Sequence, residues 1–401
     1  MSGGFSSARL QRMRAVLGAH VARGALPGYV TLLWRRGEAV ADVAGAREFG
    51  GTTMRRDTIF RITSMTKPIV AAAAMILVEE CRLRLDDPVA TFLPEFANPK
   101  VLARLDAPLA DTVPAARAIN LRDLLTFRLG SGMIFGLPGR YPIQKAIAEL
   151  GIVGFGPPDQ ATRIGSDEWL RRFATLPLMH QPGESWMYNV GSVLLGILIA
   201  RATGGTLEKF LRERIFDPLG MKDTGFSVPR AKLDRLSAAY WPNDATGALA
   251  KSDGIDDSKW IGEPVFADGS AGLVSTADDY LAFGRMMLGK GRLGGERVLS
   301  RAAVELMATD HLTEAQKTRS AWFPGMWDHC GWGMGVLVYG GRGDLWARPG
   351  RFGWDGGYGT SWYCDPNEDM IGLLMTQRAG LPLLNPVWRD FWTCAYQAID
   401  D

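Results

Sequence analysis

The sequence predicts a mixed α/β fold of the α+β type, in which helices flank an antiparallel sheet and a mostly helical lobe is inserted. Composition supports this, because 47% of the 401 residues are hydrophobic and 22% are charged, which is enough apolar material for a sizeable core. Apolar and polar residues alternate in segments near both chain ends, as in strands. The middle of the chain carries apolar patterns of helical period. At ~150 residues per domain, the length suggests two or three structural units.

The N-terminal part predicts a helix and then a β-hairpin. An amphipathic pattern over residues 7–21 indicates the helix. Residues 28–35 and 38–44 alternate as two short strands, and the Arg36-Gly37 pair between them is typical of a tight turn.

Near the C-terminus, strand patterns cover residues 331–339, 345–348, 360–364 and 370–376, and a closing helix is predicted over residues 385–398. This arrangement mirrors the N-terminal helix and hairpin. We therefore expect the two ends of the chain to share one sheet.

The middle of the chain predicts helices over residues 121–127, 167–174, 193–203, 207–215 and 277–288. We expect residues 1–70 and 268–401 to form the lobe with the antiparallel sheet and residues 71–267 to form a helical lobe, with the active site in the cleft between them. Two long stretches, 128–164 and 238–270, show little periodicity. Loops of that length are usually functional or mobile, and tolerated surface insertion is the alternative.

Charge and cysteine usage exclude several classes of function. Lys and Arg number 45 against 43 Asp and Glu, so no global field would recruit nucleic acid, and a small uncharged partner is expected.

The N-terminus lacks the apolar core of a secretory signal, which predicts a cytoplasmic protein. The apolar run at 68–78 is too short to span a bilayer and is typical of a buried helix. Four cysteines and four histidines without metal-binding spacing predict reduced thiols and neither metal nor cofactor.

Ser64-Met65-Thr66-Lys67, at the start of this apolar helix, is an S-x-x-K motif. Three residues of helix place the Ser64 hydroxyl and the Lys67 amine on one face, and a helix N-terminus offers N–H groups to an oxyanion. Apolar neighbours would desolvate Lys67 and lower its pKa towards that of a usable base, with Ser64 as the nucleophile. The alternative is that Thr63 or Ser64 caps the helix and Lys67 extends to solvent.

The wider sequence resembles the serine β-lactamase-like hydrolases, which include class C β-lactamases, DD-peptidases and family VIII carboxylesterases. The string DTIFRITSMTKP at 57–68 matches their active-site segment, and LRDLLT at 121–126, PLGMKDT at 218–224 and GLVSTADDY at 272–280 match further family segments in order. The resemblance covers nearly the whole chain. It implies the β-lactamase-like fold.

The family's second motif begins with a tyrosine, and its counterpart here is Tyr188 in WMYNVGSVLLG at 186–196. A phenol beside Lys67 could take the Ser64 proton as general base and return it to the leaving group. A buried structural tyrosine is the alternative. β-Lactamases and DD-peptidases commonly have Asn two residues after this tyrosine, where this chain has Val190.

The third family motif corresponds to Trp354-Asp355-Gly356, which resembles the W-x-G pattern of family VIII esterases. We expect these three residues to bind substrate, with the glycine at a strand edge that approaches it closely. By resemblance, the N–H groups of Ser64 and Gly357 form the oxyanion hole. A glycine-rich hairpin with a packed tryptophan is the alternative.

These motifs predict a serine carboxylesterase that cleaves esters of short to medium acyl chains through an acyl-enzyme, most like a family VIII enzyme. A β-lactamase, a D-amino-acid peptidase or an acyltransferase of the same fold is the alternative, and a non-catalytic binding protein is a third possibility. No G-x-S-x-G motif is present, and His180 has no placed partner, so other serine-hydrolase arrangements are unsupported. The anion-binding lysine of many β-lactamases is replaced by Trp354, although Arg351 or Arg128 could supply a positive charge instead. The sequence leaves the oligomeric state open.

Overall fold

A seven-stranded antiparallel sheet forms the centre of the computed structural model, which describes residues 2–134, 139–152, 164–243, 246–380 and 385–401. The strand order is β11-β12-β13-β14-β15-β1-β2. Its strands are β1 (Gly28–Arg35), β2 (Glu38–Gly45), β11 (Cys330–Trp332), β12 (Leu337–Tyr339), β13 (Phe352–Asp355), β14 (Ser361–Asp365) and β15 (Met370–Met375). N-terminal β1 pairs with C-terminal β15 in the register Val30↔Met375, which confirms that both chain ends share one sheet.

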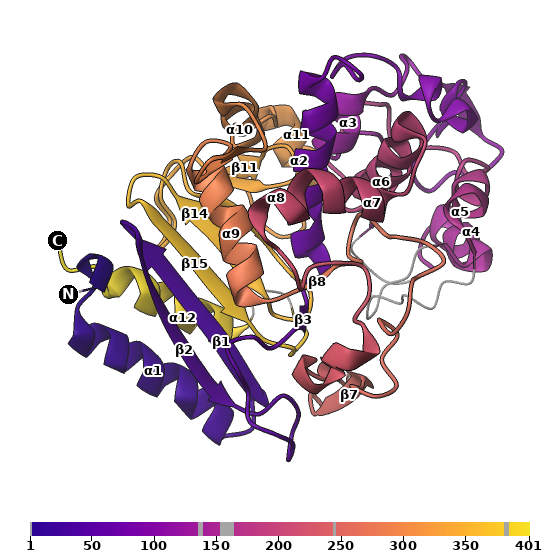
Figure 1. Cartoon of the computed structure of the whole chain (residues 1–401). Coiled ribbons are helices and arrows are strands. Elements are labelled where there is room, and N and C mark those ends of the chain that lie inside the picture. Colours follow the sequence, from indigo (N-terminus) through magenta and orange to yellow (C-terminus); the bar gives the residue numbers. More distant parts are fainter. Residues whose placement is uncertain (1, 135–138, 153–163, 244–245, 381–384) are drawn as a thin grey trace.

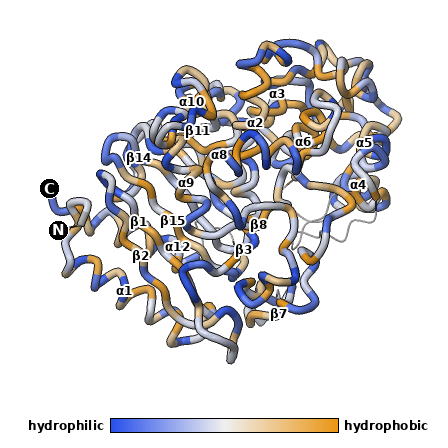
Figure 2. Tube along the Cα trace, in the orientation of Figure 1, coloured by the Kyte–Doolittle hydropathy of each residue, from blue (hydrophilic) through white to orange (hydrophobic). Residues whose placement is uncertain are grey.

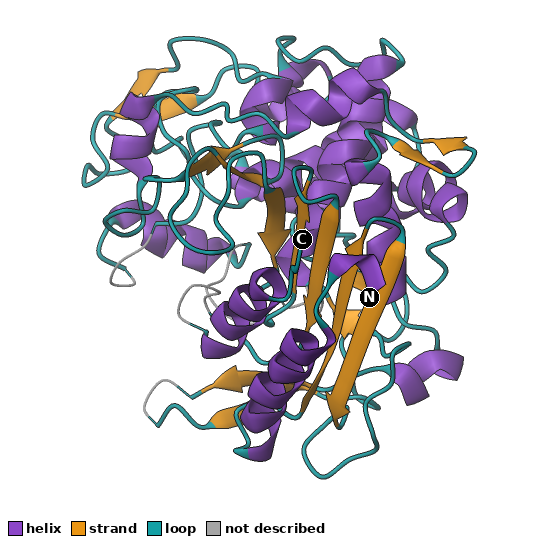
Figure 3. Cartoon of the chain, turned by 90° about the vertical axis from the view of Figure 1, so that its left-hand side faces the viewer, coloured by secondary structure: helices purple, strands orange, loops and turns teal. Residues whose placement is uncertain are grey.

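Helices cover both faces of the sheet. α1 (Ser7–Ala22) and α12 (Pro386–Gln397) pack together on one face, which is turned towards the viewer in Figure 3. α9 (Ala277–Leu288) lies on the opposite face, where the Cys364 thiol of β14 donates to the Gly284 carbonyl. All six residues of β15 are buried, and successive residues contribute to different hydrophobic clusters on the two faces. The termini lie side by side (Figure 1), joined by a bridge between Phe5 and Ile399.

The middle of the chain is mostly helical. Its helices are α2 (Thr66–Glu79), α3 (Leu121–Leu125), α4 (Pro142–Leu150), α5 (Ser166–Phe173), α6 (Val190–Thr203), α7 (Leu207–Leu211), the π-helix η5 (Arg212–Phe216) and α8 (Asp217–Leu219). α10 (Arg301–Met307) and α11 (Glu314–Ser320) precede β11. α2 and α6 are buried along most of their length and pack against each other, and Figure 2 shows hydrophobic residues along this central region.

Short elements complete the fold. Paired strands are β3 (Phe60–Arg61) with β8 (Val274–Ser275), β4 (Lys100–Leu102) with β5 (Thr112–Pro114), β6 (Ala239–Pro242) with β7 (Leu249–Asp253) and β9 (Arg292–Leu293) with β10 (Glu296–Arg297). Short 3-10 helices are η1 (Ser2–Gly4), η2 (Thr63–Met65), η3 (Val89–Thr91), η4 (Pro94–Phe96) and the longer η6 (Arg230–Arg235).

Two strand predictions near the C-terminus were wrong. The segment 331–339 is not one strand but the hairpin of β11 and β12, because Gly335 turns the chain with a φ of 76°. Its turn packs on α2, since a Cβ at Gly335 would lie 2.6 Å from that of Ala71. Residues 345–348 form no strand. In the loop that they form instead, Leu345 is 61% exposed and Trp346 packs edge-on against Trp388.

The two long stretches without periodicity contain regular structure. Helix α4 lies within 128–164, and the β6–β7 hairpin lies within 238–270. Residues 135–138, 153–163 and 244–245 of these stretches lie outside the described residues. No single helix among the described residues has the length and apolarity to cross a membrane, although Val190–Thr203 and Leu207–Leu219, bent by 82°, meet that criterion as a pair. The four cysteines, Cys81, Cys330, Cys364 and Cys394, are free.

Candidate active site

Ser64 lies in η2, one turn before α2 begins at Thr66, rather than in α2 itself. Thr63 adopts a φ of 44°, which is uncommon for a β-branched residue and turns the chain sharply into η2. The turn is fixed from α9, where the Tyr280 hydroxyl donates to the Met65 carbonyl at 2.8 Å. Ser64 is partly exposed, whereas both of its neighbours are buried. The local backbone therefore exposes the Ser64 side chain while it buries those of Thr63 and Met65.

Lys67 is the second residue of α2 and is 1% exposed. Its Nζ lies 2.9 Å from Ser64 Oγ and donates to the Ser270 carbonyl at 2.7 Å. The Tyr188 ring centroid is 4.5 Å from Nζ. Burial lowers the pKa of Lys67 to about 7, and the negative charge of Asp268 opposes this shift. The amine can therefore exchange a proton near neutral pH.

Tyr188 lies just before α6, and its hydroxyl hydrogen-bonds Ser64 and accepts the indole N–H of Trp354 at 2.8 Å. Burial raises the pKa of the phenol well above its ordinary value, so the hydroxyl keeps its proton at neutral pH. Its backbone is also fixed, because the Tyr188 carbonyl accepts from Met133 N–H at 2.7 Å. The rings around Tyr188 are those of Phe127, Trp186, Trp322, Trp332 and Trp354.

The turn after β13 lies against the segment that leads to Ser64. A Cβ at Gly356 would lie 2.4 Å from the Ile62 carbonyl oxygen, so only glycine fits there. A Cβ at Gly357 would lie 3.9 Å from Thr63 Oγ1. Gly357 is exposed, and within the described part of the chain its N–H donates to no other group. Gly357 therefore has an unpaired backbone donor close to Thr63, the residue before Ser64.

Asp355 was expected to bind substrate, but its side chain is on the opposite face of β13 from Trp354. The Asp355 carboxylate accepts from the Ser361 hydroxyl at 2.5 Å, from the Tyr363 hydroxyl at 2.8 Å and from the Trp388 indole at 2.7 Å. Burial raises its pKa. Because successive strand residues face opposite ways, Trp354 faces Tyr188 and Asp355 faces α12. The carboxylate does not reach the substrate side.

The two arginines proposed as alternative positive charges are also placed elsewhere. Arg351 is fully buried, and its guanidinium lies 3.7 Å from the Tyr363 ring centroid and 4.2 Å from that of Trp392. Arg128 donates to Thr126 Oγ1 and to the His311 carbonyl. Neither guanidinium is directed at Ser64 through any described contact.

Sequence reasoning missed the Ser270 carbonyl and the ring of Trp322. The carbonyl could not be found from the sequence because every residue type carries one. Trp322 lies 134 positions from Tyr188 in sequence, although their ring centroids are 5.2 Å apart. Val190 is 3% exposed and packs in the hydrophobic core, so it offers nothing to a substrate.

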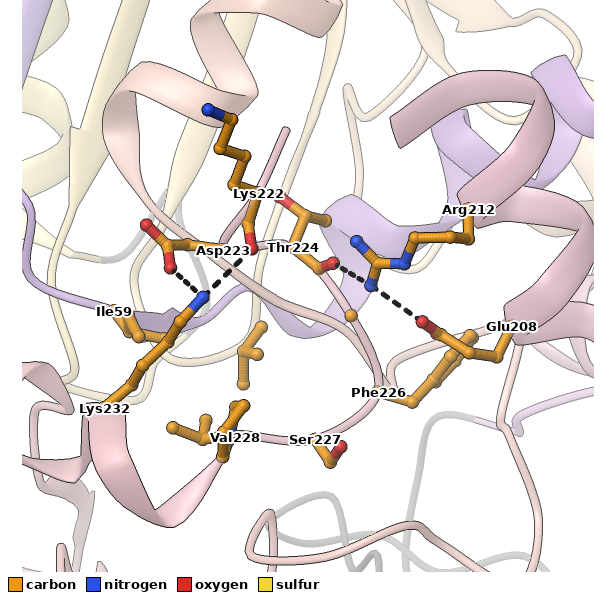
Figure 4. Close-up of a pocket in the computed structure, with 13 residues that line it drawn as sticks. Ile59, Glu208, Arg212, Lys222, Asp223, Thr224, Phe226, Ser227, Val228 and Lys232 are labelled. Carbon is orange, nitrogen blue, oxygen red and sulfur yellow. Dashed lines mark hydrogen bonds and ion pairs between the residues drawn. The ribbon is translucent and has the colours of Figure 1, made fainter. Parts of the chain in front are cut away.

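A separate pocket, shown in Figure 4, contains none of these residues. It lies around the loop from Lys222 to Pro229. Lys232 donates to Asp223, and Arg212 donates to Glu208 and to the Thr224 carbonyl (Figure 4). These four charged side chains are thus paired with one another. Among the described residues, no group of three His, Cys, Asp or Glu side chains is arranged to hold a metal ion.

Comparison with known proteins bears on the whole chain. The family model described as Beta-lactamase matches residues 13–393. Protein Rv1367c of Mycobacterium tuberculosis is 40% identical over 363 residues, covering 88% of this chain and 86% of that protein. Esterase EstB of Burkholderia gladioli is 30% identical over 367 residues, covering 87% and 83%. The solved structure of EstCE1, a hydrolase with promiscuous acyltransferase activity, has a TM-score of 0.77 and 24% identity over 98% of each chain, and it shares the fold.

Proposed function

Because the chain belongs to the beta-lactamase family, we propose that it is a serine hydrolase that cleaves carboxylic esters of short to medium acyl chains through an acyl-enzyme on Ser64. The convergence of Ser64, Lys67 and Tyr188 carries this proposal. Esterase EstB, as a relative 30% identical to this chain, supports ester hydrolysis over other reactions of the family.

In acylation, neutral Lys67 takes the Ser64 proton across the 2.9 Å contact while Oγ forms a bond to the acyl carbon. The N–H groups of Ser64 and Gly357 stabilise the oxyanion, since the first N–H groups of a helical segment lack partners within it and the Gly357 N–H has no other partner among the described residues. Tyr188 keeps its proton at neutral pH and gives it to the leaving alkoxide as the C–O bond breaks, and the Lys67 ammonium restores it. Water then attacks the acyl carbon by the same route, which releases the acid and returns a proton to Ser64.

The substrate would lie between the sheet, which supplies Trp354 and Gly357, and the helical part of the chain, which supplies Tyr188. Trp354 and Trp322 give this space apolar walls beside the Tyr188 hydroxyl. Apolar walls favour a neutral ester as substrate, which supports an esterase of the W-x-G type, like those of family VIII.

Two assays test the proposal. Wild-type protein and Ser64→Ala are incubated with a fluorophosphonate and analysed by mass spectrometry, and p-nitrophenyl esters of increasing acyl length are assayed with both. We expect an adduct on Ser64 and a loss of kcat of ~10³ or more in the variant. Lys67→Ala and Tyr188→Phe should cause similar losses that do not add. A folded Ser64→Ala protein that keeps more than about a tenth of the activity would exclude Ser64 as nucleophile, and absence of any adduct would favour a binding protein.

A further inference from the structure

The loop from Asp268 to Gly272, before β8, provides the second hydrogen-bonding partner of Lys67. Ser270 is 1% exposed, and its carbonyl accepts from Lys67 Nζ at 2.7 Å. This contact and the 2.9 Å contact with Ser64 fix the position of Nζ. The amine stays in place only if the Ser270 carbonyl does.

Asp268 holds this loop in shape. Its Oδ1 accepts from the Ser270 N–H at 2.8 Å and its Oδ2 from the Ser270 hydroxyl at 3.0 Å. Its own carbonyl accepts from the Gly272 N–H at 2.9 Å. Gly269 packs against α6, since a Cβ there would lie 2.6 Å from the Ser192 carbonyl oxygen. The carboxylate thus binds the N–H and the hydroxyl of Ser270, and the Ser270 carbonyl is left to accept from Lys67.

Asp268 also places a negative charge near the buried amine. Within the described chain, Lys67 Nζ contacts the Ser64 hydroxyl, the Tyr188 ring and the Ser270 carbonyl. The charged group that acts on it is the Asp268 carboxylate, which lies in the same loop as Ser270. Tyr188 keeps its proton and is uncharged at neutral pH, so Asp268 supplies the charge. Asp268 raises the pKa of Lys67 against the larger lowering effect of burial.

We propose that Asp268 is a positioning residue for Lys67, which holds the Ser270 carbonyl against the amine and keeps a negative charge beside it. The inference rests on the proposed function for its catalytic consequence, but its physical content concerns Lys67 alone. Neither the S-x-x-K motif nor the other family segments include this residue.

Asp268→Asn separates charge from position, because an amide oxygen can still accept the Ser270 N–H while the charge is lost. The acid limb of kcat/KM should move to lower pH by roughly 0.5–1 unit, because loss of the anion lowers the pKa of Lys67 and the amine then stays neutral down to a lower pH. The plateau rate should stay within about threefold. Asp268→Ala also removes the clamp, and its plateau should fall by about tenfold, as a misplaced catalytic group costs rate.

Asp365→Asn is the matched control. Asp365 accepts the N–H two residues later, as Asp268 does. It lies at the opposite end of β14 from Ser361, which pairs with Asp355 next to the turn that holds Gly356 and Gly357. We expect its acid limb to coincide with that of the wild type. Near-UV circular dichroism of each variant establishes that it is folded.

A direct titration makes the test independent of ester turnover. Protein labelled with ¹³C at lysine Cε is titrated by NMR, where Lys67 is the signal that moves near neutrality and disappears in Lys67→Arg, since ordinary lysines titrate near 10.4. A lower midpoint in Asp268→Asn than in wild type supports the inference. Coincident midpoints would overturn it. Absence of ester hydrolysis would reject the proposed function, while the NMR midpoints would still decide the role of Asp268.

Discussion

Lys67 is an amine that folding removes from water, and its burial sets the pH at which Ser64 can react. With its pKa lowered to about 7, Lys67 binds a proton below neutrality and cannot accept that of Ser64. We expect kcat/KM for a p-nitrophenyl ester to rise with pH through about 7 and to level off above it. At one unit below the midpoint, roughly a tenth of the plateau should remain. A pH-independent rate between 5 and 8 would contradict this role for Lys67.

The same burial affects stability, which provides a check that needs no substrate. The unfolded chain binds a proton at Lys67 up to about 10.4, whereas the folded chain releases it near 7. The unfolded state therefore binds more protons between these values, so the cost of burying Lys67 is full below the folded pKa and fades as pH rises. Lys67→Met should be more stable than wild type at pH 6 by thermal unfolding, and the difference should shrink towards pH 10.

The hydrogen bond from Trp354 to Tyr188 makes a second prediction at the residue scale. Trp354→Phe keeps an apolar ring beside Tyr188 but removes the N–H that lies 2.8 Å from its hydroxyl. One neutral hydrogen bond is worth ~0.5–1.5 kcal/mol, so kcat should fall by about 2- to 12-fold with little change in KM. Trp346→Phe is the control, because the indole N–H of Trp346 has no partner among the described residues. Equal kcat values for both variants would show that this hydrogen bond does not matter.

Residue chemistry explains which parts of the site the sequence could predict. Ser64 and Lys67 are three positions apart, so helical geometry alone brings them together, and the surrounding motif added Tyr188. The Ser270 carbonyl depends on a loop about two hundred residues away, which no local pattern describes. The side chain of Asp355 was expected on the wrong face of β13, because the sequence does not specify which face of a strand lies towards the substrate.

At the scale of elements, β13 is held between the site and α12 by the buried charge of Asp355. Asp355→Asn would turn an amide towards the Ser361, Tyr363 and Trp388 donors. It would also leave Arg351, whose guanidinium has no hydrogen-bond partner among the described residues, without the charge that opposes it. We expect a loss of about 2–3 kcal/mol in unfolding free energy, measured in urea at pH 7.

A double-mutant cycle distinguishes this charge effect from simple loss of packing. Arg351→Met removes the buried cation, and the double variant should lose less stability than the sum of the two single losses. Strictly additive losses would show that the two charges do not compensate each other.

Helices and strands were predicted correctly where the apolar periodicity extended over many residues, and wrongly where the prediction rested on one residue. α9 begins and ends as predicted, at 277 and 288, because its Thr276 cap and apolar face agree. The false strand at 345–348 rested on one buried tryptophan in an irregular loop. Helix α4 was missed because the glycine- and proline-rich residues around it obscured its nine-residue pattern.

At the scale of the whole molecule, the chain closes on itself through β1 and β15. Their pairing joins positions more than three hundred residues apart, and strand alternation at both ends made it predictable although no local signal specifies it. The lobe boundaries at 70–71 and 267–268 remain a prediction. α2 leaves the sheet region and packs on α6, so the element that carries Lys67 links both parts of the chain.

The charge of the whole molecule predicts a preference for neutral esters over β-lactams that carry a carboxylate. The formal charge is only +2, and Arg351 and Arg128 are both engaged away from Ser64, so neither a long-range field nor either of these cations attracts an anion there. Trp354 presents an indole whose N–H already bonds Tyr188, and Val190 is buried in the core, so neither offers a charged contact to the substrate. The absence of one charge-assisted contact to the β-lactam carboxylate costs ~1.5–3 kcal/mol, or roughly ten- to a hundredfold in kcat/KM for the β-lactam. We therefore expect p-nitrophenyl butyrate to exceed nitrocefin by at least that factor, and Trp354→Lys to raise the nitrocefin value selectively. Comparable kcat/KM values for the two substrates in the wild-type protein would show that the missing cation does not set specificity.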